Sequence, residues 1–209
     1  MPAMEVETPV GTARVEVHGA AQDRGVLLLG HGAGGGTDSP DLVTATRAAV
    51  DAGVHVAAVE QPYRVAGRRA PAPARQLDAA WLAVASALAS DRFPELPLLF
   101  GGRSSGARVA CRTAGAGGAE AVLCLAFPVH PPGKPEKHRL AELDGVDVPV
   151  LVVQGASDPF GRPEPAPHRQ VVLVAGNHSL RGEQDLVYRA VHEWLDRVLR
   201  PLDLSDSTA

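Results

Sequence analysis

A glycine-rich turn with a serine at its centre is the segment of this sequence with the clearest chemical meaning. The segment Gly102-Arg103-Ser104-Ser105-Gly106 follows the apolar run 96–101 and precedes a helical pattern. A Gly-x-Ser-x-Gly sequence between a strand and a helix is typical of a nucleophile elbow, a turn so tight that only small residues fit beside the serine. The pattern predicts acyl transfer, with Ser104 as the nucleophile and the backbone N–H of Ser105 as a donor to the oxyanion.

An acid and a base follow the serine in the order that this chemistry needs. A serine hydroxyl is a weak nucleophile until a base removes its proton, and the base needs an acid that fixes its tautomer. Asp158 follows the apolar run 150–154, and His178 follows the apolar run 171–174. Because the carboxyl ends of parallel strands meet at one edge of a sheet, we predict a catalytic triad of Ser104, Asp158 and His178.

Other acids fit the same role less well. Glu164 is a weaker alternative acid. Asp144 and Asp147 precede the next strand, so they are expected at the opposite edge of the sheet. An Asp before Pro and a loop His also occur without any catalytic role, and the triad therefore depends on the order of all three residues.

A second glycine-rich loop, residues 30–35, has two interpretations. It matches Gly-x-Gly-x-x-Gly, and Glu60 ends the following strand, where a dinucleotide-binding fold places its ribose-binding acid. However, the loop follows a predicted hairpin and begins with His31-Gly32, a pattern that supplies an oxyanion-hole amide in serine hydrolases. We favour the second interpretation and expect the N–H of Ala33 to contact the oxyanion; a nicotinamide-dependent oxidoreductase stays as the less favoured alternative.

Three residues beside these motifs are candidates for the substrate pocket: His31, Arg103 and His130. For His130 a structural role is equally compatible with its place in a proline-rich segment. The histidines show no His-Glu-x-x-His and no paired spacing, so we expect no metal site, and the proposed chemistry needs no cofactor. Basic residues near the expected mouth would favour anionic substrates, although loop arginines are usually solvated; they are Arg64, Arg68, Arg69, Arg103 and Lys134.

Composition indicates a globular protein with one domain. The chain has 209 residues, and we expect the domain over 1–202 and a disordered tail over 203–209. A net charge of −4 argues against a general nucleic-acid or membrane-surface binder. Without a signal-peptide pattern or a long apolar stretch, a cytoplasmic location is expected. Cys111 and Cys124 are expected as buried packing residues rather than a disulfide, and the oligomeric state is left open.

Alternating strand and helix patterns predict an α/β fold with a mainly parallel central sheet and helices on both faces. An antiparallel hairpin is expected at the N-terminal edge, without a large lid domain; the loops 60–75 and 128–145 are left open as a partial lid. Strands are predicted over 4–8, 13–17, 26–29, 54–59, 96–101, 121–126, 148–154 and 170–174. Helices are predicted from Pro40 to Gly53, over 76–90, over 107–114, and over 186–199 before Pro201.

Together, the elbow, the His-Gly loop and the segments with Asp158 and His178 resemble a small α/β hydrolase of the dienelactone-hydrolase-like kind. More closely, they resemble the family of testis-expressed protein 30 and the KANSL3 chromatin-complex subunit, over residues 24–200. The matching segments are 101–104, 127–136, 158–161 and 177–180. The resemblance implies an α/β-hydrolase fold and an intact triad, and it does not indicate the substrate. Because no lid is expected to enclose a long chain, we expect a small acyl substrate, an ester or a thioester. One branch of the family is an interaction subunit, so a protein-interaction scaffold is the alternative.

Overall fold

A single, mostly parallel sheet forms the centre of the molecule, and the structure is a computed structural model that describes residues 3–200. The strands in this part of the chain are β1 (Met4–Thr8), β2 (Gly11–His18), β3 (Val26–Gly30), β4 (His55–Glu60), β5 (Leu98–Arg103), β6 (Ala121–Leu125), β7 (Val150–Gly155) and β8 (Arg169–Val174). Their order across the sheet is β1-β2-β4-β3-β5-β6-β7-β8. β1 and β2 form the predicted antiparallel hairpin, β2 pairs antiparallel with β4, and the remaining pairs are parallel. The predicted fold class is confirmed.

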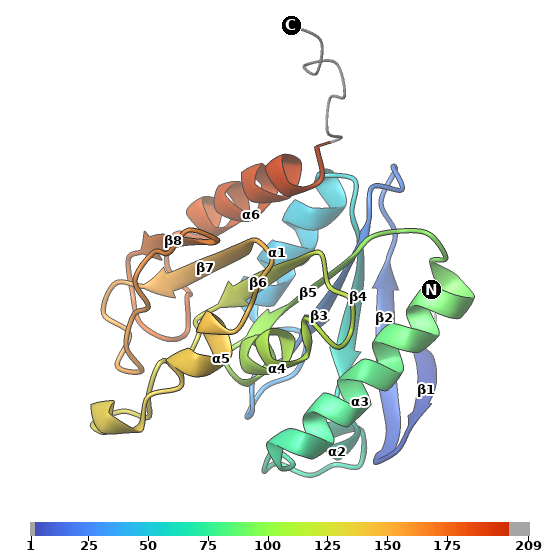
Figure 1. The fold of residues 1–209 in the computed structure, drawn as a ribbon, viewed down its shortest axis with the longest axis horizontal. Coiled ribbons are helices and arrows are strands. Elements are labelled where there is room, and N and C mark those ends of the chain that lie inside the picture. Colours follow the sequence, from blue (N-terminus) through green and yellow to red (C-terminus); the bar gives the residue numbers. More distant parts are fainter. Residues whose placement is uncertain (1–2, 201–209) are drawn as a thin grey trace, which may run out of the picture.

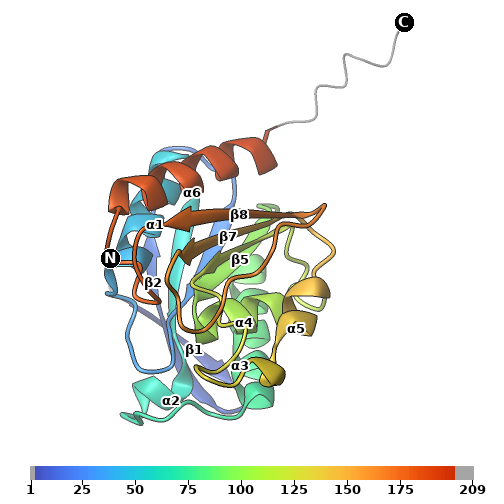
Figure 2. The same ribbon diagram turned by 90° about the vertical axis from the view of Figure 1, so that its left-hand side faces the viewer.

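Helices cover both faces of the sheet. They are α1 (Pro40–Asp51), α2 (Pro62–Val65), α3 (Ala74–Ala87), α4 (Ser105–Thr113), α5 (Leu140–Asp144) and α6 (Gln184–Val198), with a π-helical turn η1 (Leu88–Arg92) and a 3-10 turn η2 (Pro135–Lys137). Figures 1 and 2 show α1 and α6 together on one face and α3, α4 and α5 on the other. None of the helices in the described part of the chain is both long and apolar enough to cross a membrane.

The apolar runs form two cores, one on each face of the sheet. In β3, Val26 and Leu28 belong to the core under α3 and α4, whereas Leu27 and Leu29 belong to the core under α1 and α6. Successive side chains of a strand point to opposite faces, so a strand covered on both sides must be apolar at every position. This is why the central strands lack the alternating pattern of the hairpin.

Short elements account for the main departures from the sequence predictions. The predicted loop 60–75 contains α2, and the predicted loop 128–145 contains η2 and α5. Four or five residues are too few for a 3.6-residue period to show, so these turns carried no visible pattern. The helix expected over 76–90 begins earlier, at Ala74. The predicted tail 203–209, the end of the predicted domain at 202 and Pro201 lie outside the described residues.

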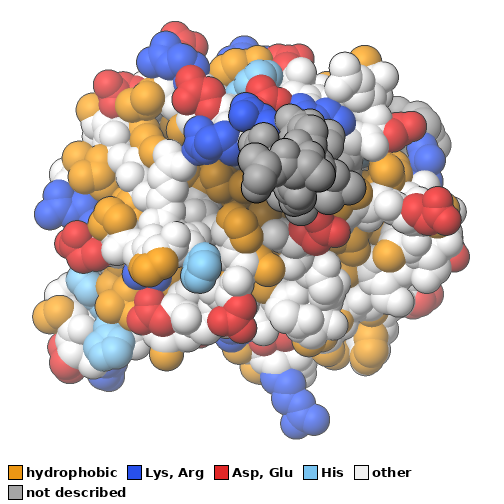
Figure 3. Space-filling view, turned by 45° about the horizontal axis from the view of Figure 1, so that its top comes forward, with side chains coloured by type: hydrophobic (Ala, Val, Ile, Leu, Met, Phe, Trp, Pro, Cys, Tyr) orange, Lys and Arg blue, Asp and Glu red, His pale blue; other side chains and the backbone are white. Residues whose placement is uncertain are grey.

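The two cysteines agree with the sequence analysis. Cys111 and Cys124 are buried and free, with their Sγ atoms 3.5 Å apart. On the face seen in Figure 3, acidic and basic side chains are intermixed with apolar ones.

Candidate active site

Ser104 occupies the sharp turn between β5 and α4. Its backbone angles are φ 53° and ψ −107°, an unusual conformation for a residue with a side chain. The turn is fixed by two backbone hydrogen bonds, from Ser104 N to Leu125 O (2.9 Å) and from Arg108 N to Ser104 O (3.2 Å). Backbone strain of this kind costs on the order of 1–3 kcal/mol and persists only where the surrounding structure holds it. The geometry is that of the predicted elbow.

The two glycines of the motif permit this turn to lie against β3. A Cβ atom on Gly106 would lie 2.4 Å from Gly30 O, and one on Gly102 would lie 2.6 Å from the carbonyl carbon of Gly106. Gly30 and Gly102 are also paired across β3 and β5. Backbone approaches backbone here without room for a side chain, which explains the small residues on both sides of Ser104.

The predicted base and acid lie next to Ser104 in space. His178 Nε2 is 2.9 Å from Ser104 Oγ, and His178 Nδ1 is 2.8 Å from Asp158 Oδ2. Ser104 follows β5, Asp158 follows β7 and His178 follows β8, so one edge of the sheet brings together residues that are up to 74 positions apart in the sequence. Because an ionised carboxylate only accepts, Nδ1 carries the proton, and Nε2 is left to accept the proton of the serine hydroxyl.

A glutamine that the sequence analysis missed holds the Asp158 carboxylate. Gln154 Nε2 donates to Asp158 Oδ2 (2.8 Å), and the Phe160 N–H donates to Asp158 Oδ1 (2.8 Å). The same amide nitrogen lies 3.1 Å from Phe127 O and 2.9 Å from Gly161 O. All three neighbours are acceptors, which fixes the orientation of the amide. The available signal was a polar residue closing the otherwise apolar run 150–154.

Neither of the two predicted oxyanion donors has a hydrogen-bond acceptor among residues 3–200. Ser105 is the first residue of α4, so its N–H has no acceptor within the helix. Among residues 3–200, the N–H of Ala33 donates to no other group, while the Ala33 carbonyl accepts from the Tyr63 hydroxyl (3.1 Å). Burial raises the pKa of Tyr63, which keeps this hydroxyl protonated as a donor. α2 therefore supports the loop from behind.

The dinucleotide interpretation of the loop 30–35 loses its structural basis. A pyrophosphate site of that kind needs a helix N-terminus within the glycine motif. Here α1 begins only at Pro40, five residues after Gly35. Glu60, the expected ribose-binding acid, instead pairs with Arg14 of β2 at 3.2 Å.

Comparison with known proteins identifies the family of this fold. A model of the alpha/beta hydrolase domain matches residues 23–192. The chain belongs to the α/β hydrolase family. No curated protein matches the sequence. The family supplies the fold and the general hydrolase character, and it leaves the substrate open.

Solved structures show the same fold at low sequence identity. An α/β serine hydrolase without a lid from Xanthomonas campestris (XC6422) is 20% identical, with 96% of each chain covered and a TM-score of 0.76. Est1E from Butyrivibrio proteoclasticus is 15% identical, covering 95% of this chain and 99% of the other, with a TM-score of 0.76. A dienelactone hydrolase from Anabaena variabilis is 16% identical, covering 94% and 96%, with a TM-score of 0.73.

In this α/β hydrolase the His31 side chain is buried beneath the loop 30–35, of which it is a part. It is 3% exposed, and both ring nitrogens are engaged: Nδ1 with Gly32 O (2.8 Å) and Nε2 with the Gln61 N–H (3.1 Å). Because Nε2 accepts, the proton is on Nδ1 and the ring is neutral. Burial lowers the pKa of His31 accordingly. The sequence analysis expected His31 in the substrate pocket. In the structure its ring instead points inward, because both ring nitrogens hydrogen-bond to buried backbone groups.

The neutral state of His31 predicts a loss of stability in acid. Since the pKa of His31 is lower in the folded chain than its ordinary value of 6.5, the unfolded chain binds the extra proton first as the pH falls. The free energy of unfolding should therefore decrease below about pH 6.5. Urea unfolding between pH 7.5 and 5 should show a smaller decrease in His31→Gln than in the wild type. Equal decreases in both would contradict this assignment.

Loss of the Gln154 amide should impair the reaction through Asp158. A hydrogen bond to a charged group contributes about 1.5–3 kcal/mol, so Gln154→Leu is expected to lower kcat about 10- to 100-fold. KM should change little, because Gln154 is buried away from solvent. Steady-state kinetics on a small ester check this, and Gln170→Leu on β8 is the exposed control. A KM effect without a kcat effect would contradict the role.

Arg103 and His130 tie the catalytic loops to their surroundings. Arg103 lies 3.0 Å from the buried carboxylate of Asp41 in α1 and donates from Nη2 to His178 O (3.1 Å). The His130 N–H donates to Phe160 O (2.9 Å), next to the acid loop. The Phe160 ring in turn stacks on the His178 ring, with centroids 4.1 Å apart. Arg103 thus contacts His178, and His130 contacts the segment that follows Asp158; contact of either residue with substrate stays a prediction. Among the described side chains, no three His, Cys, Asp or Glu come together as metal ligands.

Proposed function

We propose that this α/β hydrolase is a serine hydrolase that cleaves a small ester or thioester through an acyl-enzyme on Ser104. The observation that carries the proposal is the unbroken hydrogen-bonded series Ser104 Oγ, His178 Nε2, His178 Nδ1 and Asp158 Oδ2, at 2.9 and 2.8 Å. An acceptor nitrogen within reach of the serine hydroxyl, oriented by a carboxylate, is the arrangement that activates a serine.

The reaction runs in two halves. His178 Nε2 takes the proton of Ser104 as Oγ attacks the acyl carbon, and the Asp158 carboxylate stabilises the imidazolium that forms. The N–H groups of Ala33 and Ser105 hold the negative charge that develops on the acyl oxygen. His178 then protonates the leaving group. Water, deprotonated by His178, attacks the acyl-enzyme and releases the acid with Ser104 restored; no cofactor or metal enters these steps.

Several observations support a small substrate. Within residues 3–200, the loop between β4 and α3 contains only the short helix α2, and the connection between β6 and β7 contains only η2 and α5. One structural neighbour is described as a serine hydrolase without a lid, and others as a dienelactone hydrolase and as Est1E with bound ferulic acid. An open site exposes its substrate to water, which suits small acyl groups better than long chains.

The closer resemblance to testis-expressed protein 30 and the KANSL3 subunit adds a second candidate, a scaffold for protein interaction. A scaffold has no need of the three triad residues in hydrogen-bonding order. The strained backbone at Ser104 costs stability, and a fold released from catalysis has no reason to keep it. These features favour the hydrolase with a small-molecule acyl substrate over the scaffold.

Labelling with a fluorophosphonate tests the proposal. The wild type should be labelled on Ser104, and Ser104→Ala should not be labelled. Ser105→Ala is the matched control, because it removes the adjacent hydroxyl and keeps the backbone N–H; it should be labelled like the wild type. Absence of labelling in the folded wild type, or labelling that persists in Ser104→Ala, would refute the serine mechanism. NADH binding without labelling would favour the oxidoreductase.

A further inference from the structure

The Arg103 side chain joins three segments around the active site. As the last residue of β5, Arg103 directly precedes Ser104. Its Nη2 donates to the backbone carbonyl of His178 (3.1 Å), and its Nε lies 3.0 Å from Asp41 Oδ2 in α1. Its Nη1 lies against the oxyanion loop, because a Cβ atom added to Gly32 would be only 2.8 Å from it. One planar guanidinium therefore spans the base, α1 and the oxyanion loop.

The Asp41 carboxylate depends on this guanidinium. The Asp41 side chain is fully buried, and neither of its oxygens accepts a hydrogen bond from the described residues. Among those residues, Arg103 is also its only salt-bridge partner. Asp41 lies in the first turn of α1, where the helix dipole favours a negative charge. Because a buried carboxylate without a counter-charge is costly, the ion pair holds Arg103 against α1.

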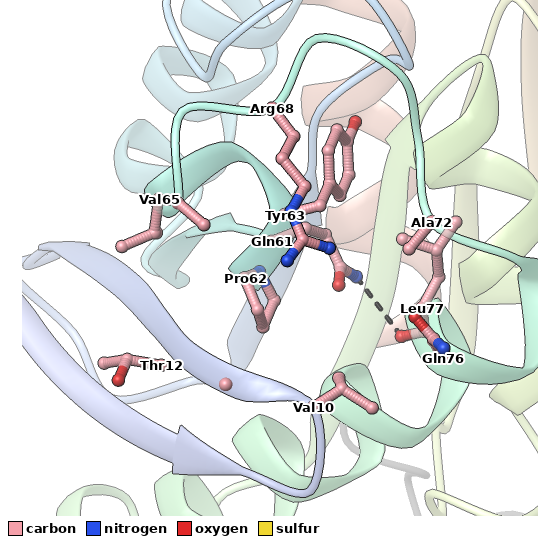
Figure 4. Close-up of a pocket in the computed structure, with 12 residues that line it drawn as sticks. Val10, Thr12, Gln61, Pro62, Tyr63, Val65, Arg68, Ala72, Gln76 and Leu77 are labelled. Atoms are coloured by element: carbon pink, nitrogen blue, oxygen red, sulfur yellow. Dashed lines mark hydrogen bonds between the residues drawn. The ribbon is translucent and has the colours of Figure 1, made fainter.

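A guanidinium held in this way is poorly suited to bind a substrate anion. The Asp41 carboxylate already balances its charge, and the Arg103 side chain is 20% exposed. Arg68, another basic residue near the expected mouth, differs in both respects. It lies in the exposed loop after α2, beside a cavity of about 290 Å³ (Figure 4), and forms no salt bridge with the described residues. A preference for anionic substrates would therefore come from residues such as Arg68.

We propose that Arg103 is a positioning residue that sets the distance between nucleophile and base, with Asp41 as its buried anchor. The backbone of Arg103 leads directly into Ser104, and its guanidinium holds the backbone of His178. Both therefore support the 2.9 Å separation of Ser104 Oγ and His178 Nε2. A misplacement of about 1 Å between reacting groups costs about 100-fold in rate. The proposal rests on the proposed hydrolase reaction and adds two residues to it.

Arg103→Lys separates the charge of the guanidinium from its shape. An ammonium group retains the charge that Asp41 needs, but its single nitrogen cannot contact Asp41 and the His178 carbonyl at once. The midpoint of urea unfolding should therefore stay within about 0.5 M of the wild type. In contrast, kcat for a small ester should fall about 10- to 100-fold, with little change in KM. A wild-type kcat in Arg103→Lys would overturn the proposal, because the guanidinium would then act through its charge alone.

Arg103→Met and Asp41→Leu separate catalysis from stability. Either substitution alone leaves a buried charge without its partner and should lower the midpoint of urea unfolding by about 1–2 M. The double variant contains no unpaired charge, so its midpoint should return to within about 0.5 M of the wild type. Its kcat should nevertheless stay as low as that of Arg103→Met. If kcat recovers together with the midpoint, the ion pair has only a structural role and the proposal fails.

Two substrates distinguish positioning from substrate binding. Methyl butyrate and monomethyl succinate have acyl chains of equal length, and only the second carries a carboxylate. If Arg103 positions the base, Arg103→Lys and the double variant should lower kcat by the same factor for both esters. A loss confined to monomethyl succinate, seen as a higher KM, would assign Arg103 to anion binding and overturn the proposal. Arg47→Met is the control, because Arg47 is an exposed arginine on the same helix as Asp41; it should leave both rates unchanged.

A measurement without turnover keeps this proposal separate from the proposed function. The proton on His178 Nδ1, which is shared with Asp158 Oδ2 (2.8 Å), should give a downfield NMR resonance in the wild type and in Arg47→Met. The resonance should broaden in Arg103→Lys and in the double variant, because the segment that carries His178 is no longer held. If the wild type is neither labelled nor active, the proposed function fails, while this resonance still decides the positioning role. An unchanged resonance in both folded variants would overturn it.

Discussion

Ser104→Ala is expected to lower kcat for a small ester by about 10⁴-fold or more, with the fold unchanged. The substitution removes the attacking oxygen, which lies 2.9 Å from His178 Nε2, and leaves the oxyanion donors in place. Alanine retains a Cβ atom, so the conformation at φ 53° is no worse for it than for serine. Initial rates, compared with the uncatalysed reaction, measure the loss of kcat. Urea unfolding of the wild type and of Ser104→Ala checks that the fold is unchanged.

The triad should also behave as one unit. Ser104→Ala combined with His178→Ala is expected to be little slower than Ser104→Ala alone, because residues that act in one step give strongly non-additive losses. Ser105→Ala is the control and should remain within about tenfold of the wild type, since its catalytic contribution is a backbone N–H. Full activity of Ser104→Ala, or multiplicative losses in the double variant, would contradict the proposed mechanism.

Gly106→Ala is expected to reduce the free energy of unfolding by about 3 kcal/mol and to abolish fluorophosphonate labelling. A Cβ atom at this position would lie 2.4 Å from Gly30 O and 2.8 Å from His31 O, so α4 must move away from β3. The same movement displaces Ser104 and the N–H of Ser105. The free energy of unfolding and the labelling of Ser104 should therefore fall together, because both depend on the close approach of Gly106 to the backbone of Gly30.

Gly115→Ala is the matched control for this substitution. Gly115 follows the same helix and is exposed, and a Cβ atom added to it would meet nothing within 4 Å. We expect its free energy of unfolding within about 0.5 kcal/mol of the wild type and normal labelling. Urea unfolding of the two variants measures the difference, and a Gly106→Ala protein as stable as Gly115→Ala would show that the elbow does not require this close approach.

The strands of the sheet and the turn at Ser104 could be predicted from the sequence, because each is marked by a pattern of neighbouring residues. Apolar runs of the correct length mark the covered strands, and a small-residue turn between a strand and a helix marks the elbow. Chain order alone then put Asp158 and His178 at strand ends. Gln154 was not found, because one polar residue at the end of an apolar run has no signature until its partner is known. α2 and α5 were missed because single helical turns leave no period.

By itself, the sequence determined the α/β class, the hairpin at one edge, and the chain order of the proposed nucleophile, acid and base. These follow from periodicity, turn chemistry and chain order, which act over a few residues or along one strand. Only the tertiary structure decided that His31 is buried as a neutral ring, that Gln154 holds Asp158, and that α2 supports Ala33 beside a cavity. Those contacts join segments from different strands and loops. They therefore depend on strand register and on how closely two backbones approach, and no single stretch of chain determines either quantity.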